Sequence, residues 1–539
     1  MSMRRFERVK DPNDLQKAIK YGEIAVATVP PDHPIEAVIY DNLAGLLVTR
    51  FERIGDISDL QQAIKHREAA LVAAPPNHPD KASAYHNLSI TLMKRFERIH
   101  DLSDLEQAIK HSEAALEATP PDHPERAGRF NNLGNRFIAR FERLGDLSDL
   151  KQAIRHGEAA LAATPPDHPD RASRHNNLSI MFLARFQRMG DLGDLQQATK
   201  HGEAASAATP LNHPFKSSAY NNLSNISMRR FERIGDLSDL EQAIKHSEAA
   251  LETTPPDHPE RASRFSNLGN RFLTRFERLG DLSDLKQAIR HGEAALAATP
   301  PDRPDRVYKY NNLGIMLLTR FERTGDLSDL HQAITHGKAA LEVIPPDDSN
   351  AAMTTYHNVS VMFWRRFGRM GDLDDLQRAI EYGGTALAAT PSDHPHRIKA
   401  NDNIGILLAS RFARTGGLSD LQQAIKHSEA TLIATPSGHP DRPSRYNNLG
   451  SMLLARFERT GDRSDLQKAI THGETALEAT PSDLPGRAVI YNSLSTKYMM
   501  KFEQIGDLND LQQAIKHGVA ALAARPSDHP DRASTYNNL

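Results

Sequence analysis

An asparagine recurs at one place in a repeated pattern along the chain, directly before an aliphatic residue. Because a carboxamide is both a hydrogen-bond donor and an acceptor, a row of them could hold an extended peptide backbone without reading its side chains. The alternative is that each amide bonds a neighbouring helix or loop and serves stacking. The peptide-binding prediction rests on ten residues, which we call the asparagine ladder: Asn42, Asn87, Asn132, Asn177, Asn222, Asn267, Asn312, Asn358, Asn403 and Asn448.

The residue three positions after each ladder asparagine varies between aliphatic and polar types. If the ladder holds a peptide backbone, these positions would supply the specificity of the groove. Alternating apolar and amide patches suit an amphipathic or extended segment. The predicted specificity positions are Ile90, Asn135, Ile180, Asn225, Asn270 and Ile315.

Histidines form two further series. Imidazole could bind a metal ion or sense protons. Like positions in adjacent repeats should lie about 8–10 Å apart, however, which is too far to share an ion easily. We therefore predict no metal site and assign these histidines to the helix surface and to N-terminal capping. One series is His66, His111, His156, His201, His246, His291, His336, His427, His472 and His517, and the other is His33, His78, His123, His168, His213, His258, His394, His439 and His529.

A phenylalanine that follows Arg or Lys marks the register of the repeat. Successive phenylalanines are 45 residues apart, except for one gap of 46 between Phe321 and Phe367. A fixed period of this size is typical of stacked supersecondary units, and the phenylalanines are predicted to be core. The series is Phe6, Phe51, Phe96, Phe141, Phe186, Phe231, Phe276, Phe321, Phe367, Phe412, Phe457 and Phe502.

One repeat, from Pro124 to Thr164, shows the expected elements. Pro124 is predicted to start a first helix, and Gly145 to end it in a left-handed conformation. A second helix is predicted to open at Ser148, whose counterparts in other repeats form a capping box with Glu or Gln. The small residue Gly157 would let two helices approach closely. The expected apolar stripes are Phe130, Leu133, Phe137, Phe141 and Leu144 on the first helix, and Leu147, Leu150, Ile154 and Leu161 on the second.

Each repeat is therefore expected to hold a helix of roughly 20 residues, a tight turn, a helix of roughly 16 and a Pro-rich loop. Neither helix can bury its stripe alone, and stacking of neighbours does so. The sequence predicts an all-α fold, a single α-solenoid over residues 1–539 with about twelve units, the last incomplete. Because the loop 345–350 carries the change in repeat length, we predict a weak joint between about residues 345 and 405.

Short motifs in these repeats resemble a known family. The runs Tyr310–Gly314 and Tyr446–Gly450 resemble the first helix of a tetratricopeptide repeat, and Asp167–Ala172 resembles the kinesin-light-chain type of loop. Ala153 looks like the small residue of the second helix. The resemblance covers the whole chain and implies a right-handed superhelix of antiparallel helix pairs. It also implies that the ladder asparagines lie on the concave face and hydrogen-bond a peptide backbone.

Composition excludes several classes of function. The chain has no cysteine, which removes disulfides, thiol nucleophiles and cysteine-based zinc sites. A net charge of −3 gives no argument for nucleic acid, and no apolar run approaches the roughly 20 residues that span a bilayer. We find no Walker loop, no Rossmann glycine pattern and no Gly-x-Ser-x-Gly motif, so we expect neither catalysis nor a cofactor. Without an apolar stretch at Met1–Lys10, no signal peptide is expected, and the cytoplasm is the predicted location.

These observations favour a scaffold that binds a peptide or partner protein on its concave face. Two alternatives stay open. The 45-residue form resembles fungal tetratricopeptide arrays that often accompany a caspase-like CHAT domain, so the chain could be the sensor or autoinhibitory arm of a larger receptor-protease. It could also be an architectural spacer that self-associates, because neither end of the array shows a polar cap.

Overall fold

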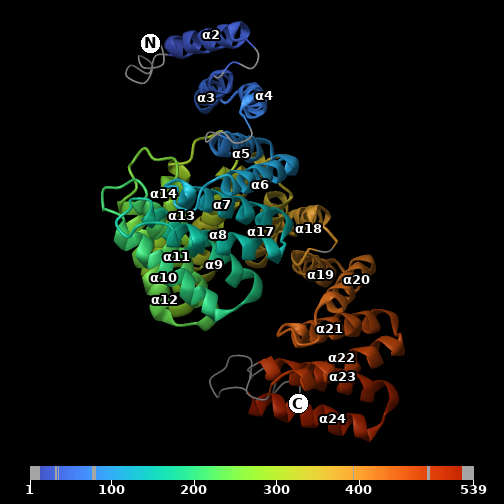
Figure 1. The fold of residues 1–539 in the computed structure, drawn as a ribbon. Coiled ribbons are helices and arrows are strands. Elements are labelled where there is room, and N and C mark those ends of the chain that lie inside the picture. The colour runs from blue at the N-terminus through green and yellow to red at the C-terminus, as the bar shows by residue number, and fades with distance from the viewer. Residues whose placement is uncertain are drawn as a thin grey trace. The chain divides into compact units, whose positions relative to one another are not determined.

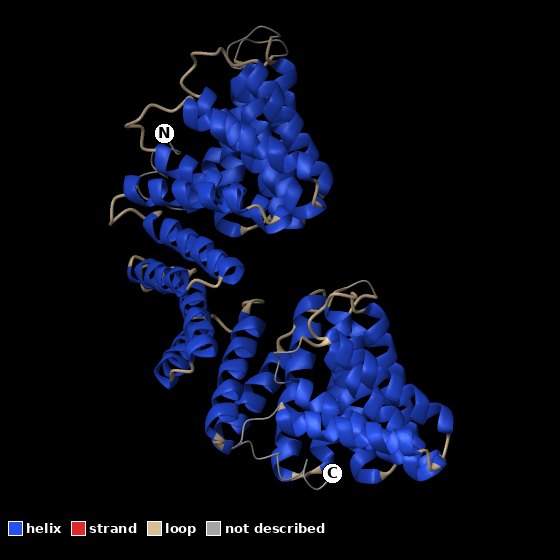
Figure 2. Cartoon of the chain, turned by 90° about the horizontal axis from the view of Figure 1, so that it is seen from below, coloured by secondary structure: helices blue, strands red, loops and turns tan. Residues whose placement is uncertain are grey.

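The chain folds into paired helices. The structure is a computed structural model that describes residues 12–30, 33, 35–75, 81–392, 394–481 and 486–524. Within these ranges it contains helices, turns and loops and no strand, which confirms the predicted all-α fold (Figures 1 and 2). The first helices of the repeats are α3 (Glu36–Ile54), α5 (Lys81–Ile99), α7 (Arg126–Leu144), α9 (Arg171–Met189), α11 (Lys216–Ile234), α13 (Arg261–Leu279), α15 (Arg306–Thr324), α17 (Ser349–Met370), α19 (His396–Thr415), α21 (Arg442–Thr460) and α23 (Gly486–Ile505). The second helices are α2 (Pro12–Thr28), α4 (Ile57–Ala73), α6 (Leu102–Glu117), α8 (Leu147–Ala162), α10 (Leu192–Ala208), α12 (Leu237–Glu252), α14 (Leu282–Ala297), α16 (Leu327–Glu342), α18 (Leu373–Ala389), α20 (Leu418–Ala434), α22 (Arg463–Ala479) and α24 (Leu508–Ala523).

The helices form two compact units, Met1–Arg271 and Phe272–Leu539, and the boundary between them falls within α13. Inside each unit a first helix packs on the second helix that follows it, and that second helix packs on the next first helix. The observed lengths, 19 residues for α7 and 16 for α8, agree with the expected ones. The ends of the array, predicted to lack caps, lie outside the described residues.

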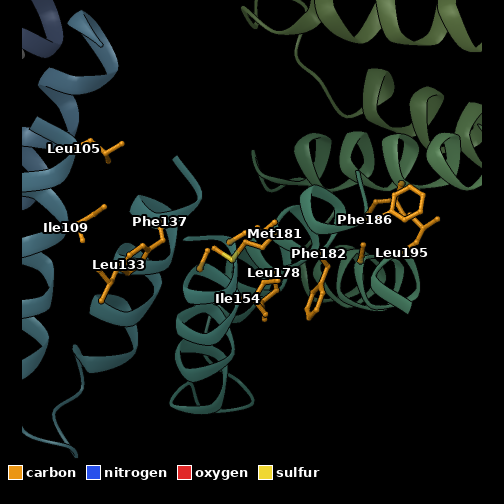
Figure 3. Packing of buried hydrophobic residues seen from close by; sticks show 14 of the residues in the cluster. Leu105, Ile109, Leu133, Phe137, Ile154, Leu178, Met181, Phe182, Phe186 and Leu195 are labelled. Carbon is orange, nitrogen blue, oxygen red and sulfur yellow. The ribbon is translucent and has the colours of Figure 1, made fainter. Parts of the chain in front are cut away.

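The core of the first unit is built from the predicted apolar stripes. Leu133, Ile154 and Leu178 are buried in one cluster with Met181 (Figure 3). Burying such a side chain contributes about 1.5–3 kcal/mol, so stacking stabilises helices that would be marginal alone. The predicted apolar stripe of the first helix was wrong at one position. Leu144 is 54% exposed, because it lies in the last turn of α7, beyond the reach of the next helix pair.

The helix ends show one confirmed and one wrong prediction. Gly145 ends α7 with φ of 72°, in the left-handed region as expected. The second helix does not open through a serine capping box. Asp146 is its N-cap, and the Oδ1 atom of Asp146 accepts the backbone N–H of Ser148 at 2.8 Å. Asp146 therefore satisfies the backbone N–H of Ser148, one of the N–H groups that lack a partner within the helix. The first helix also begins later than predicted, at Arg126 rather than Pro124.

Small residues on the second helix allow close packing, as predicted. A Cβ atom on Gly157 would lie 2.8 Å from the Cδ2 atom of Leu178 and 3.2 Å from the Sδ atom of Met181. Arg67 stands at the position of Gly157 in an earlier repeat, and its NH1 atom donates to the backbone oxygen of Asn87 in the next repeat. Side chains of the following repeat thus pack closely against the small residue of the second helix.

Candidate functional site

The asparagine ladder joins successive first helices. The Nδ2 atom of Asn177 on α9 donates to the Oδ1 atom of Asn131 on α7 at 3.0 Å. In the next repeat, Asn222 donates in the same way to Asn176 at 2.6 Å. The pairs Asn176–Asn177 and Asn221–Asn222 therefore bond the preceding repeat through their second member and the following repeat through their first.

The other ladder residues vary in their contacts. Asn87 donates to Asp41 at 3.0 Å, and Asn267 donates to Asn221 at 2.9 Å. Asn403 donates to the hydroxyl of Ser360 at 3.1 Å. Among the ladder residues, Asn42 and Asn448 are exposed, Asn403 is buried, and the other seven are half-buried.

These bonds to neighbouring helices are the contacts that the stacking alternative predicts. They do not use the whole carboxamide, however. Asn177 and Asn222 each give one N–H to the preceding repeat, and no other hydrogen bond of their side chains is formed within the described part of the chain. The side chain of each therefore keeps a carbonyl oxygen and a second N–H that form no hydrogen bond within the described part of the chain.

The ladder bond is missing at the repeat that follows the loop of irregular length, 345–350. Asn311 turns its Nδ2 atom to the hydroxyl of Thr355 at 2.7 Å. Its Oδ1 atom and the Nδ2 atom of Asn358 are buried without a hydrogen-bond partner among the described residues. The link that joins other repeats is therefore missing between α15 and α17, inside the region where the sequence predicts a joint.

The specificity positions lie on the first helices beside the ladder. Ile180 is exposed, at 36% of its surface. Asn225 is half-buried, and its Oδ1 atom accepts from Arg271 at 2.7 Å. The remaining positions are half-buried: Ile90, Asn135, Asn270 and Ile315. In the first unit the position is occupied in turn by Ile90, Asn135, Ile180, Asn225 and Asn270, and their role in specificity stays a prediction.

Buried cations lie next to the ladder in the first unit. Burial lowers the pKa of Arg136 to about 10, and the NH1 atom of that side chain donates to the backbone oxygen of Asn132 at 2.7 Å. Burial also lowers the pKa of Arg271 to about 10. Burial, with the charges of Arg136 and Arg129, lowers the pKa of His86 to about 4, so this histidine is neutral near pH 7.

The histidines of the second helices are structural. His156 stacks on Phe137 with 5.6 Å between ring centroids, and burial lowers its pKa. In one repeat the aromatic partner is itself a histidine, and the Nδ1 atoms of His175 and His201 lie 2.9 Å apart. No group of three or more potential metal ligands occurs in the described ranges.

The histidines before the loop proline cap the following turn. The Nδ1 atom of His168 accepts the backbone N–H of Asp170 at 3.2 Å, directly before α9 begins. His123 and His258 make the same bond to Glu125 and Glu260. The assignment of this series to N-terminal capping is confirmed where the structure describes it; His78 and His529 lie outside the described residues.

Sequence reasoning missed the acceptor of each ladder bond. For Asn87, Asn177, Asn222 and Asn267 it is the residue directly before the ladder asparagine of the preceding repeat, whereas Asn403 donates to Ser360. A signal was available, because that position always carries a side chain able to accept a hydrogen bond. Its occupants are Asp41, His86, Asn131, Asn176, Asn221, Ser266, Asn311, His357, Asp402, Asn447 and Asn492.

Comparison with known proteins supports the expected family. Residues 82–125 and 217–260 match the family model described as tetratricopeptide repeat, which confirms the predicted tetratricopeptide repeats over these two stretches. No curated protein matches the chain. None of the described helices is both long and apolar enough to cross a membrane.

Many solved structures are similar to the chain, among them the following three. The human IFIT1 dimer with PPP-AAAA is 12% identical, with a TM-score of 0.41 over 87% of this chain and 95% of that one. The APC/C hetero-tetramer Cut9-Hcn1 is 14% identical, with a TM-score of 0.37 over 98% and 96%. Nearly identical TPR-like repeats of a putative kinesin light chain from Podospora anserina are 17% identical, with a TM-score of 0.30 over 40% and 96%.

Proposed function

We propose that this chain of tetratricopeptide repeats binds a segment of another protein along the surface formed by its first helices. The observation that carries the proposal is the half-used ladder. Asn177 and Asn222 each keep a carbonyl oxygen and an N–H after bonding the preceding repeat. Such groups match the alternating N–H and C=O groups of an extended backbone.

The partner is a segment with alternating apolar and polar side chains. Beside the ladder, Ile180 offers an exposed apolar contact, whereas Asn225 in the next repeat offers an amide. Apolar contacts and backbone hydrogen bonds are the two means by which repeat surfaces hold extended or amphipathic segments. The chain then acts as a scaffold and performs no chemistry of its own.

A second candidate is an architectural spacer. The ladder bonds favour it, because stacking alone explains why the amides recur. A spacer needs no exposed apolar side chains beside the ladder, so substitution of those side chains separates the two candidates. The third reading, an arm of a larger CHAT-type protease, rests on the resemblance alone.

The test uses peptides selected from a random library on the full chain, with affinities measured by fluorescence anisotropy. The triple variant Ile90→Asn, Ile180→Asn, Ile315→Asn removes three apolar contacts. It keeps the fold, because Asn135 and Asn225 already stand at this position in other repeats. We expect binding at least about 10-fold weaker, a loss of about 1.4 kcal/mol.

The matched control places the same substitution on second helices. Val72, Ile433 and Val519 are 87%, 85% and 54% exposed there. Their replacement by Asn is expected to leave peptide affinity unchanged. A library that yields no binder, or an equal loss in both triple variants, would contradict a binding surface on the first helices and favour the spacer.

A further inference from the structure

A basic side chain in the first turn of several first helices fills the space against the preceding repeat. Arg129 on α7 is such a residue and is 3% exposed. Its NH2 atom donates to Glu125 at 2.6 Å and to the hydroxyl of Ser83 at 3.3 Å, and its NH1 atom lies 3.5 Å from the backbone oxygen of Ala115. The guanidinium thus occupies the junction of three helices, α5, α6 and α7. Residues at the same position are Arg174, Arg264, Lys309 and Arg445.

The junction of α17, α18 and α19 lacks this side chain. Ala400 stands in the place of the arginine, and His396 stands in the place of its acidic partner. A cavity of about 140 Å³ lies there, lined by Thr354 and Ala386. These two residues correspond to Ser83 and Ala115, the neighbours of Arg129. The cavity is therefore the place that a guanidinium fills in other repeats.

The walls of this cavity carry hydrogen-bond donors. Lys399 and His396 on α19 face His357 and Asn358 on α17. The Nδ2 atom of Asn358 has no acceptor among the described residues. Burial, with the charges of Lys399 and His396, lowers the pKa of His357. None of the residues described as lining the cavity is an acid, so the negative charge that faces the basic side chain elsewhere is absent here.

We propose that this cavity binds one small oxyanion, a carboxylate or a phosphate group, held by Lys399, His357, His396 and the amide of Asn358. Water takes about 30 Å³ per molecule, so the cavity has room for such a group. Asn358 belongs to the ladder, and an acidic or phosphorylated side chain of a bound partner would be anchored there. That anchoring role rests on the proposed function; binding of a free anion does not.

The test is equilibrium dialysis of the full chain against inorganic phosphate and, separately, acetate, at constant ionic strength. The key variant is His396→Asp with Ala400→Arg, which recreates the pair seen at Asp170 and Arg174. It fills the cavity with a side chain that the fold accepts elsewhere. Lys399→Ser removes the main cation, and Ser173 stands at that position in another repeat. Lys426→Ser, on the exposed face of α20, controls for the loss of one positive charge.

We expect one saturable site per chain for wild type and Lys426→Ser. Affinity should fall at least about 10-fold in Lys399→Ser and binding should be lost in the double variant. If only phosphate binds, the cavity is a phosphate site, and if only acetate binds, it is a carboxylate site. Binding of both anions would show that the cavity recognises the oxyanion chemistry that they share. Absence of saturable binding by wild type, or equal affinity in the double variant, would overturn the proposal. Because no peptide is present, that failure is distinct from failure of the peptide-binding test.

Discussion

Arg140 and Asp149 join the two helices of one repeat through a two-point ion pair. The Nε atom of Arg140 lies 2.8 Å from one carboxylate oxygen of Asp149, and its NH2 atom lies 2.5 Å from the other. Asp149 is buried, at 2% exposure, although it sits in the first turn of α8. The hydrogen bond to Asp149 raises the pKa of Arg140. Equivalent pairs recur in both units, among them Arg95–Asp104, Arg320–Asp329 and Arg456–Asp465.

We expect Arg140→Met to destabilise the first unit by about 2–3 kcal/mol, because it leaves the buried Asp149 carboxylate without its charged partner. The measurement is the urea midpoint of the helical circular dichroism signal. Arg155→Met, at an exposed position of α8, is the matched control and should shift the midpoint little. Equal midpoints for the two variants would show that the pair contributes no more than a surface contact.

Lys497 is a fully buried amine whose Nζ atom has no partner in the described part of the chain. Burial lowers its pKa from 10.5 to about 8. Unfolding therefore takes up a proton between about pH 8 and 10.5, so the folded state gains stability as pH rises through that window. The full penalty is present below pH 8.

We expect Lys497→Met to raise the free energy of unfolding at pH 7 by about 2–3 kcal/mol. Methionine suits the site, because Met181, Met316 and Met452 occupy the same position in other repeats. The difference between wild type and variant should shrink from pH 8 to pH 10. A difference that does not change with pH would mean that the amine is not desolvated in the folded state.

A Cβ atom added to Gly157 would lie 2.8 Å from Leu178 of the next repeat, whereas Gly128 has no atom within 4 Å of an added Cβ. We expect Gly157→Val to cost about 1–3 kcal/mol through overpacking against Leu178. Gly128→Val, the same change in the same repeat, should be close to neutral. Thermal melting of the two variants measures this, and similar melting temperatures would refute close packing at Gly157.

The broken ladder link leads to a prediction about dynamics. Without the bond between Asn311 and Asn358, we expect faster amide hydrogen exchange in α17 than in α9, which keeps its bond from Asn177 to Asn131. Mass spectrometry of exchange in the full chain measures both helices together. Equal protection of α17 and α9 would contradict the prediction of a weak joint between about residues 345 and 405.

Much of the fold was predictable because it is periodic and local. The apolar spacing identified both helices of a repeat, and Gly145 marked the end of the first one. The cap of the second helix was assigned to Ser148 instead of Asp146, because both residue types cap helices and the register differs by only two residues. Leu144 was placed in the core because a helical stripe continues past the point where its neighbour ends.

The candidate site was predictable only in part. Its residues could be named from their recurrence, but a hydrogen bond between Asn177 and Asn131 depends on how one repeat is rotated on the next. Nor could the burial of Asp149 be anticipated, since an aspartate in the first turn of a helix usually faces solvent. The cavity at Ala400 could not be predicted, because the sequence does not show that an arginine at this position fills the junction of three helices in other repeats.

The most direct measurement is a hydrogen-exchange footprint of a library-selected peptide on the full chain. A peptide held by the ladder should slow exchange in consecutive first helices, such as α7, α9 and α11. Exchange in the second helices between them, α8 and α10, should be unchanged. Protection confined to second helices or to the Pro-rich loops would place the binding surface elsewhere and contradict the role proposed for the asparagines.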